Sequence, residues 1–202
     1  MPTAREALLD AALRALADRS WRTVRMVDVA ALAGVSRQTL YNEFGTKEGL
    51  AAALLRQAAD GYLTGVDRAL TAPAPEHPAA VARWTVRAAD ADPLVKGLLT
   101  GLWSERLPRP GHDVPGRDVP GPAELLGLAR DRMAAASHPM PPVRCERALR
   151  LALSYVIVPC PPGGAGTQWA EPDSCSPITP MITSEIDTSF SVETTSPRKT
   201  MP

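Results

Sequence analysis

The chain has 202 residues, enough for one or two domains, and its 22 Lys and Arg residues are balanced by 22 Asp and Glu residues. A formal net charge of zero excludes a polycation that binds DNA through charge alone, because that term grows with the number of basic contacts to phosphate. Aromatic residues make up only 4% of the chain, Ala and Leu are plentiful, and β-branched runs are few. This composition predicts an all-α fold.

Charged side chains interrupt the apolar residues of the N-terminal segment, among them Arg5, Glu6, Asp10 and Arg14. A signal peptide would carry an uninterrupted apolar stretch there, and no apolar run in the sequence approaches the ~20 residues of a membrane span. We therefore expect a soluble, cytoplasmic protein with no membrane partner.

The first helix is predicted to begin at Thr3, whose side chain can cap it while Glu6 reaches back to complete a capping box. Apolar residues then recur at helical spacing and predict one packing face: Leu8, Leu9, Ala12, Leu13 and Leu16. This helix is expected to support the two short helices that follow.

Residues 24–50 predict two short helices joined by a tight turn, and then the start of a third helix. Small apolar residues recur at helical spacing in the first of them: Val27, Val29, Ala30 and Ala33. Gly34 can take the left-handed conformation that ends a helix, and Ser36 can cap the next one. A short turn of this kind is typical of a helix-turn-helix, whose second helix enters the DNA major groove.

The second short helix, residues 37–44, is expected to turn Leu40 and Phe44 inward. Its other face is polar: Arg37, Gln38, Thr39, Tyr41 and Asn42. Arg can bond guanine, Gln and Asn can bond adenine, the Thr methyl can touch thymine, and the Tyr hydroxyl can reach a phosphate. Taken alone, the same pattern also fits an amphipathic helix with an ordinary polar face.

The stretches DVAALAGVS, TLYNEF and GTKEGL resemble the DNA-binding domain of the TetR family of transcriptional regulators, over residues 4–55. By position, the resemblance implies a recognition-helix cap at Ser36, base-facing or backbone-facing residues at Arg37, Gln38, Thr39 and Asn42, and phosphate contacts at Tyr41 and Lys47. The family usually has Thr before the first motif helix, where this chain has Arg25, with Thr23 nearby. An Arg at that position could contact phosphate instead, whereas Arg5 is interpreted as solvated, with a DNA contact as the alternative.

Beyond the motif, Thr46 can cap a long helix, residues 47–70, that links the predicted DNA-binding head, residues 1–50, to the rest of the chain. The Pro-rich residues 71–78 end it. Further helices are predicted over residues 79–91, 93–106, 123–136 and 142–158, with a loop at 107–122. The last helix is the most apolar and is a candidate subunit interface.

The predicted organisation is a DNA-binding domain (1–50), a helical ligand-binding and dimerisation domain (51–158) and a tail (159–202). The tail is dense in Pro, Ser and Thr and is expected to be disordered, because it cannot bury enough apolar surface. Regulators resembling this one usually close with a further helix that completes a dimeric four-helix bundle, and the tail does not contain that pattern.

The histidines, cysteines and glycines of the sequence form no pattern typical of a catalytic or metal site. His77, His112 and His138 lie in or beside Pro-rich segments, without ligands at metal-binding spacing, and are interpreted as exposed loop histidines. The three cysteines form no CxxC pair and are expected to be free thiols. The sequence contains no Gly-rich phosphate loop or nucleophile elbow, so we expect no metal, no cofactor and no enzymatic activity.

The Leu- and Trp-containing helices of the second domain could enclose an apolar cavity for a small apolar or amphipathic effector. The candidate lining residues are Trp84, Arg87, Leu98, Leu102, Trp103 and Leu125, with Arg87 as an anchor for an acidic ligand. The alternative is that the apolar members belong to the core and that Arg87 is a surface charge.

Together these features predict a ligand-responsive transcriptional repressor that binds double-stranded DNA at a near-palindromic operator as a homodimer. The recognition helices of the dimer would enter successive major grooves. The alternative from another class is a helical ligand-binding or protein-interaction module with a vestigial DNA-binding head.

Overall fold

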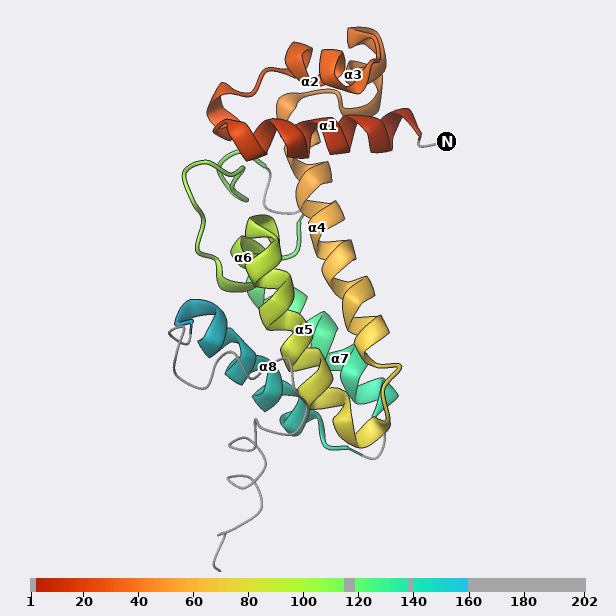
Figure 1. The fold of residues 1–202 in the computed structure, drawn as a ribbon, viewed down its shortest axis with the longest axis vertical. Helices are drawn as coiled ribbons and strands as arrows, with labels where there is room; N and C mark the ends of the chain where they lie inside the picture. The colour runs from red at the N-terminus through yellow and green to blue at the C-terminus, as the bar shows by residue number, and fades with distance from the viewer. Residues whose placement is uncertain (1–2, 115–118, 138–139, 160–202) are drawn as a thin grey trace, which may run out of the picture. The chain divides into compact units, whose positions relative to one another are not determined.

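The computed structural model describes residues 3–114, 119–137 and 140–159. These residues form an all-α fold, drawn in Figure 1, with the helices α1 (Ala4–Asp18), α2 (Met26–Ala33), α3 (Arg37–Phe44), α4 (Lys47–Ala69), α5 (His77–Ala91), α6 (Pro93–Thr100), α7 (Pro122–Ala136) and α8 (Pro142–Ile157). Short 3₁₀ helices cover Trp21–Thr23 and Ala74–Glu76. The expectations for His138 and for the disordered tail fall on residues outside these ranges.

The first three helices pack around a small apolar core at one end of α4 (Figure 1). The predicted capping box of α1 is confirmed, because Thr3 Oγ1 accepts from the Glu6 amide at 3.2 Å and Glu6 Oε2 accepts from the Thr3 amide at 2.7 Å. Leu8 of α1, Val29 of α2 and Leu40 of α3 are fully buried in this core. Burial of these apolar side chains holds the short helices in place, since helices of this length are marginal alone.

The long helix α4 runs from this head into the body, where α5, α6 and α7 pack against it (Figure 1). Thr46 caps it, as predicted, by accepting from the Gly49 amide at 3.1 Å. In the body, the ring of Trp84 lies against the backbone of Gly65, where a Cβ atom would collide with it. Glycine at position 65 therefore allows α4 and α5 to approach each other closely.

The prediction of a single helix over residues 93–106 is wrong at its C-terminal end. Asp92 does cap α6, accepting from the Leu94 amide at 2.8 Å, but the helix ends at Thr100. Gly101 follows with φ = 73°, in the left-handed conformation that terminates helices. The chain beyond Gly101 then runs back toward the head in irregular backbone.

The interpretation of His77 as an exposed loop histidine is also wrong. The helix α5 begins at His77, two residues before the predicted start at residue 79. The side chain of His77 is only 3% exposed. Its Nε2 lies 2.7 Å from the Ala72 carbonyl, and its Nδ1 lies 2.7 Å from Ser137 Oγ. A neutral imidazole can donate to one partner and accept from the other, so burial leaves no polar atom unsatisfied. His112 is exposed, as predicted.

Cys145 of α8 is a free thiol, as expected, and is fully buried. Burial raises the pKa of this thiol, which keeps it protonated and unreactive. Within the described ranges, no helix is both long enough and apolar enough to cross a membrane.

Candidate DNA interface and effector cavity

The turn between α2 and α3 has the predicted geometry. Gly34 ends α2 with φ = 69°, and the Val35 amide donates to the Ala30 carbonyl at 3.1 Å. Ser36 then caps α3, its Oγ accepting from the Thr39 amide at 3.0 Å. These local bonds fix the angle at which α3 leaves the turn.

One face of α3 is buried and the other is open to solvent, as its sequence predicts. Leu40 and Phe44 face the core. The side chains of Arg37, Gln38, Tyr41 and Asn42 are exposed, whereas Thr39 is half-buried.

Within this polar face, Gln38 Nε2 donates to Asn42 Oδ1 at 2.8 Å. Because the residues are one helical turn apart, this bond restricts both amide side chains before any ligand arrives.

Two further basic residues of the predicted interface are engaged within the head. Arg25 precedes α2 without capping it, and its guanidinium makes two bonds of 3.1 Å to Asp28. Lys47, at the start of α4, is half-buried; its Nζ donates to the Arg22 carbonyl at 3.3 Å and lies 5.1 Å from the centre of the Trp21 ring. Burial lowers the pKa of Lys47, while the nearby carboxylate of Asp113 opposes that effect.

Arg5 is exposed, as expected for a solvated side chain, and it also connects α1 to α3. Its guanidinium donates to the Glu43 carbonyl at 3.3 Å and lies 4.7 Å from the centre of the Phe44 ring. Its positive charge is placed at the negative end of the α3 dipole. Spacing along the chain could not predict this contact, because the partners are far apart in sequence.

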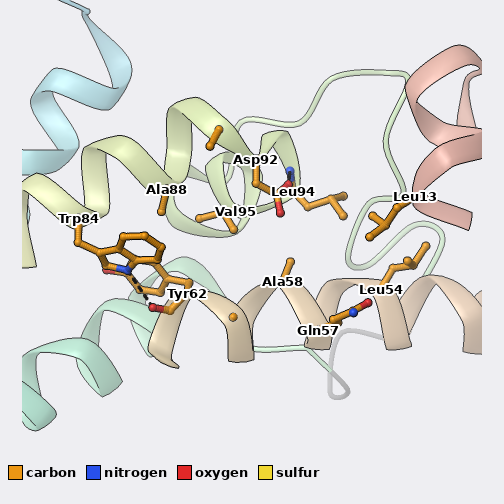
Figure 2. A pocket seen from close by; sticks show the side chains of 12 residues that line it. Leu13, Leu54, Gln57, Ala58, Tyr62, Trp84, Ala88, Asp92, Leu94 and Val95 are labelled. Atoms are coloured by element: carbon orange, nitrogen blue, oxygen red, sulfur yellow. Dashed lines mark hydrogen bonds between the residues drawn. The ribbon is translucent and has the colours of Figure 1, made fainter. Parts of the chain in front are cut away.

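An open cavity of about 280 Å³ lies where α1, α4, α5 and α6 meet (Figure 2). Most of its walls are apolar, and its lining comprises Leu13, Leu54, Gln57, Ala58, Gly61, Tyr62, Trp84, Ala88, Ala91, Asp92, Leu94 and Val95. Because Leu13 belongs to α1, the cavity borders the N-terminal three-helix head directly.

Of the six candidate lining residues, the structure places Trp84 at this cavity. Leu98 and Leu125 are buried in the core. Arg87 and Leu102 are exposed, and Trp103 packs on Gly97 of α6. Leu13, Gln57 and Tyr62 line the cavity without having been expected to, since only the tertiary fold brings α1 and α4 to the same space.

Aromatic polar groups at the cavity have partners within the protein. Tyr62 Oη lies 3.0 Å from Thr85 Oγ1. Trp84 Nε1 donates to the Tyr62 carbonyl at 3.0 Å (Figure 2). Gln57 and Asp92 supply the other polar side chains of the lining. Such a surface suits a molecule with an apolar body and few polar groups.

Burial raises the pKa of Tyr62 from 10.0 to about 12. Between these values the unfolded chain loses the phenolic proton while the folded chain keeps it, so stability present below pH 10 is lost as pH rises toward 12. We expect Tyr62→Phe to remove this dependence, which amounts to about 2–3 kcal/mol over the interval. Denaturant unfolding of both proteins across the range checks it, and parallel pH profiles would contradict it.

A helix-turn-helix with an exposed polar recognition helix, mounted on a helical body with a cavity, defines a DNA-binding transcriptional regulator. Residues 8–54 match the family model described as bacterial regulatory proteins, tetR family. The chain is 34% identical over 159 residues to the HTH-type transcriptional regulator AlkX of Mycobacterium tuberculosis (strain ATCC 25618 / H37Rv), covering 77% of this chain and 75% of that protein. The chain belongs to the TetR family of transcriptional regulators and is therefore not an enzyme.

Among solved structures, the chain is similar to the TetR family repressor AlkX from Dietzia sp. strain DQ12-45-1b, a protein implicated in biodegradation of n-alkanes. The sequences are 22% identical, the match covers 83% of this chain and 89% of that chain, and the TM-score is 0.47.

Proposed function

We propose that this regulator is a ligand-responsive repressor that binds a near-palindromic operator as a homodimer. The observation that carries the proposal is the exposed polar face of α3, backed by the buried Leu40 and Phe44. The head has an apolar core and Ser36 caps α3, so the recognition helix is a rigid element that can dock as a unit.

Base recognition is assigned to Arg37, Gln38, Thr39 and Asn42. Arg37 and the Gln38–Asn42 pair offer the donors and acceptors that read purine edges in the major groove. Ser36 caps the helix, so that its first turn can approach the DNA.

Phosphate contacts are assigned to Tyr41, Lys47 and Arg25. Tyr41 is exposed beside the base-reading residues. Arg25 and Lys47 reach phosphate by exchanging their present partners, Asp28 and the Arg22 carbonyl, for the DNA backbone. Contacts to phosphate fix register and do not read sequence.

Dimerisation is assigned to α7 and α8. Large apolar side chains of these helices are exposed: Leu128, Val143, Leu151 and Ile157. An apolar surface shared by neighbouring helices is suited to a self-complementary interface, and a two-fold dimer would present its recognition helices to both half-sites of a palindrome.

The cavity at the α1, α4, α5 and α6 junction is assigned to a small apolar or amphipathic effector. An occupant would touch Leu13 of the head and Leu94 of α6 together. Occupancy would then favour a different placement of α1 relative to the body and shift the population away from the DNA-binding form.

Tyr41→Phe and Lys47→Ala are each expected to weaken binding to all DNA sequences by about three- to ten-fold, since each removes a phosphate contact. Lys47→Ala should also reduce the salt dependence of log K by about one unit. Fluorescence anisotropy with a random duplex pool, over a series of salt concentrations, measures both quantities. Unchanged affinity for random DNA in both variants would contradict the phosphate assignment.

A further inference from the structure

Residues 103–114, which follow α6 and its terminating Gly101, are bonded to the DNA-binding head. The Trp21 amide donates to the Arg106 carbonyl at 2.8 Å, and Ser20 Oγ donates to the Glu105 carbonyl at 3.4 Å. In the opposite direction, Arg106 Nη2 donates to the Asp18 carbonyl at 3.2 Å. Three bonds thus join this segment to the connection between α1 and α2.

The bond from Arg106 has a specific role at the end of α1. Asp18 is the last residue of that helix, where carbonyl groups lack helical partners and the helix dipole is negative. The last turn of α1 contains no basic residue of its own. Arg106 therefore adds, from the body of the protein, a donor and a positive charge to this helix end, while the guanidinium of the C-cap residue Arg19 pairs with Asp28.

The other end of the segment is held by α6. The Trp103 ring lies over Gly97, where an added Cβ would come within 2.6 Å of the ring. The same helix contributes Leu94 and Val95 to the wall of the cavity. A displacement of α6 would therefore move Trp103 directly.

Between these anchors and Val114, the segment is folded tightly on itself. The Gly111 amide donates to the Val114 carbonyl at 2.7 Å, and the Asp113 amide donates to the Arg109 carbonyl at 2.8 Å. Gly111 has φ = 79°, a conformation that favours glycine. Asp113 Oδ2 accepts from the Arg109 amide at 2.9 Å, which places this carboxylate within the turn. In the head, Lys47 Nζ donates to the Arg22 carbonyl at 3.3 Å and lies 5.1 Å from the centre of the Trp21 ring, so the position of the Trp21–Thr23 turn also determines that of Lys47.

We propose that residues 103–114 form a strap through which α6 sets the position of the Trp21–Thr23 turn and of Lys47 in the head. The strap is a short mechanical connection between the cavity wall and the DNA-binding surface, running beside the longer connection through α4. The positioning role of the strap can be measured on the protein without DNA. Its consequence for regulation rests on the proposed operator binding.

The head end of the strap is tested with Arg106→Ala in the full chain. We expect hydrogen–deuterium exchange of the Trp21 amide to become about five-fold faster, as for loss of one exposed hydrogen bond. Arg109→Ala is the matched control, because it removes the same charge from the same segment, and Arg109 joins the internal turn through its backbone. Equal exchange in the two variants would overturn the strap.

The α6 end is tested with Gly97→Ala, which pushes against Trp103 without touching the head. Gly127→Ala in α7 is its control, because a Cβ there meets no atom within 4 Å. We expect faster exchange at Trp21 in the first variant and unchanged exchange in the second. Slow exchange in α8 of both variants verifies that the fold is intact, and an unchanged Trp21 in Gly97→Ala would show that α6 does not act through the strap.

The DNA consequence is measured separately, on a random duplex pool. Arg106→Ala and Arg109→Ala lose equal charge, so the strap predicts about three-fold weaker binding for Arg106→Ala than for its control. If Arg106→Ala and Arg109→Ala bind DNA equally although Trp21 exchanges faster in Arg106→Ala, the strap does not influence the DNA-binding surface. Failure of the unaltered protein to bind any duplex would contradict the proposed function, while the exchange data would still decide whether the strap exists.

Discussion

Gly65→Ala is expected to lower the free energy of unfolding by about 2 kcal/mol, in contrast to most glycine replacements within helices. A Cβ at this position of α4 would collide with the ring of Trp84. The ring cannot move freely, because its Nε1 is bonded to the Tyr62 carbonyl. Either that bond or the spacing between α4 and α5 must change, and both costs exceed the gain in helix propensity.

Gly61→Ala is the control for this prediction, because it lies one turn earlier in α4 and an added Cβ meets no atom within 4 Å. It should stabilise the protein by about 0.5–1 kcal/mol through backbone entropy alone. Denaturant unfolding of the two variants measures the difference. Equal stabilisation by both substitutions would mean that α5 does not press on α4 through Trp84.

Gln38→Ala is expected to reduce affinity for the operator by about ten-fold or more and to leave affinity for random DNA nearly unchanged. A bidentate contact to a base discriminates by about 1–3 kcal/mol, and this substitution removes it without removing charge. It also releases Asn42 from its 2.8 Å bond with Gln38, so the freed amide can select other bases.

The check is affinity for the selected operator and for random duplexes, measured at one salt concentration. Tyr41→Phe on the same helix serves for comparison, because loss of a phosphate contact should weaken both kinds of DNA alike. Equal losses on operator and random DNA for Gln38→Ala would contradict the assignment of Gln38 to base reading.

The sequence predicted the head well because its structure depends on local chemistry. Gly34 and Ser36 determine the turn through bonds to residues at most five positions away. The inward turn of Leu40 and Phe44 follows from helical spacing. None of these features needs knowledge of the rest of the fold.

The wrong predictions concern a residue whose partners include one distant in sequence, His77, and a helix end just before Gly101. His77 is buried because the preceding turn brings the Ala72 carbonyl to it and α7 brings Ser137. The helix after Pro93 ends at Thr100, and Gly101 follows it in the left-handed conformation. A glycine at this position is a helix-stop signal that the sequence does contain.

The cavity was the least predictable feature. Apolar periodicity identifies residues that are buried, as Leu98 and Leu125 are, but it cannot separate the core from the wall of an open space. Leu13 reads as an ordinary member of the α1 packing face, yet it lines the cavity. Only the arrangement of α1 against α4 and α6 reveals that role.

Dimeric, sequence-specific DNA binding is tested most directly by determining the mass of the full protein in solution and sequencing the duplexes that it retains from a random pool. We predict a dimer that enriches an inverted repeat with half-sites one helical turn apart, in the manner of two-fold helix-turn-helix proteins. A strict monomer that enriches no sequence would contradict the repressor and favour a module that acts through other proteins.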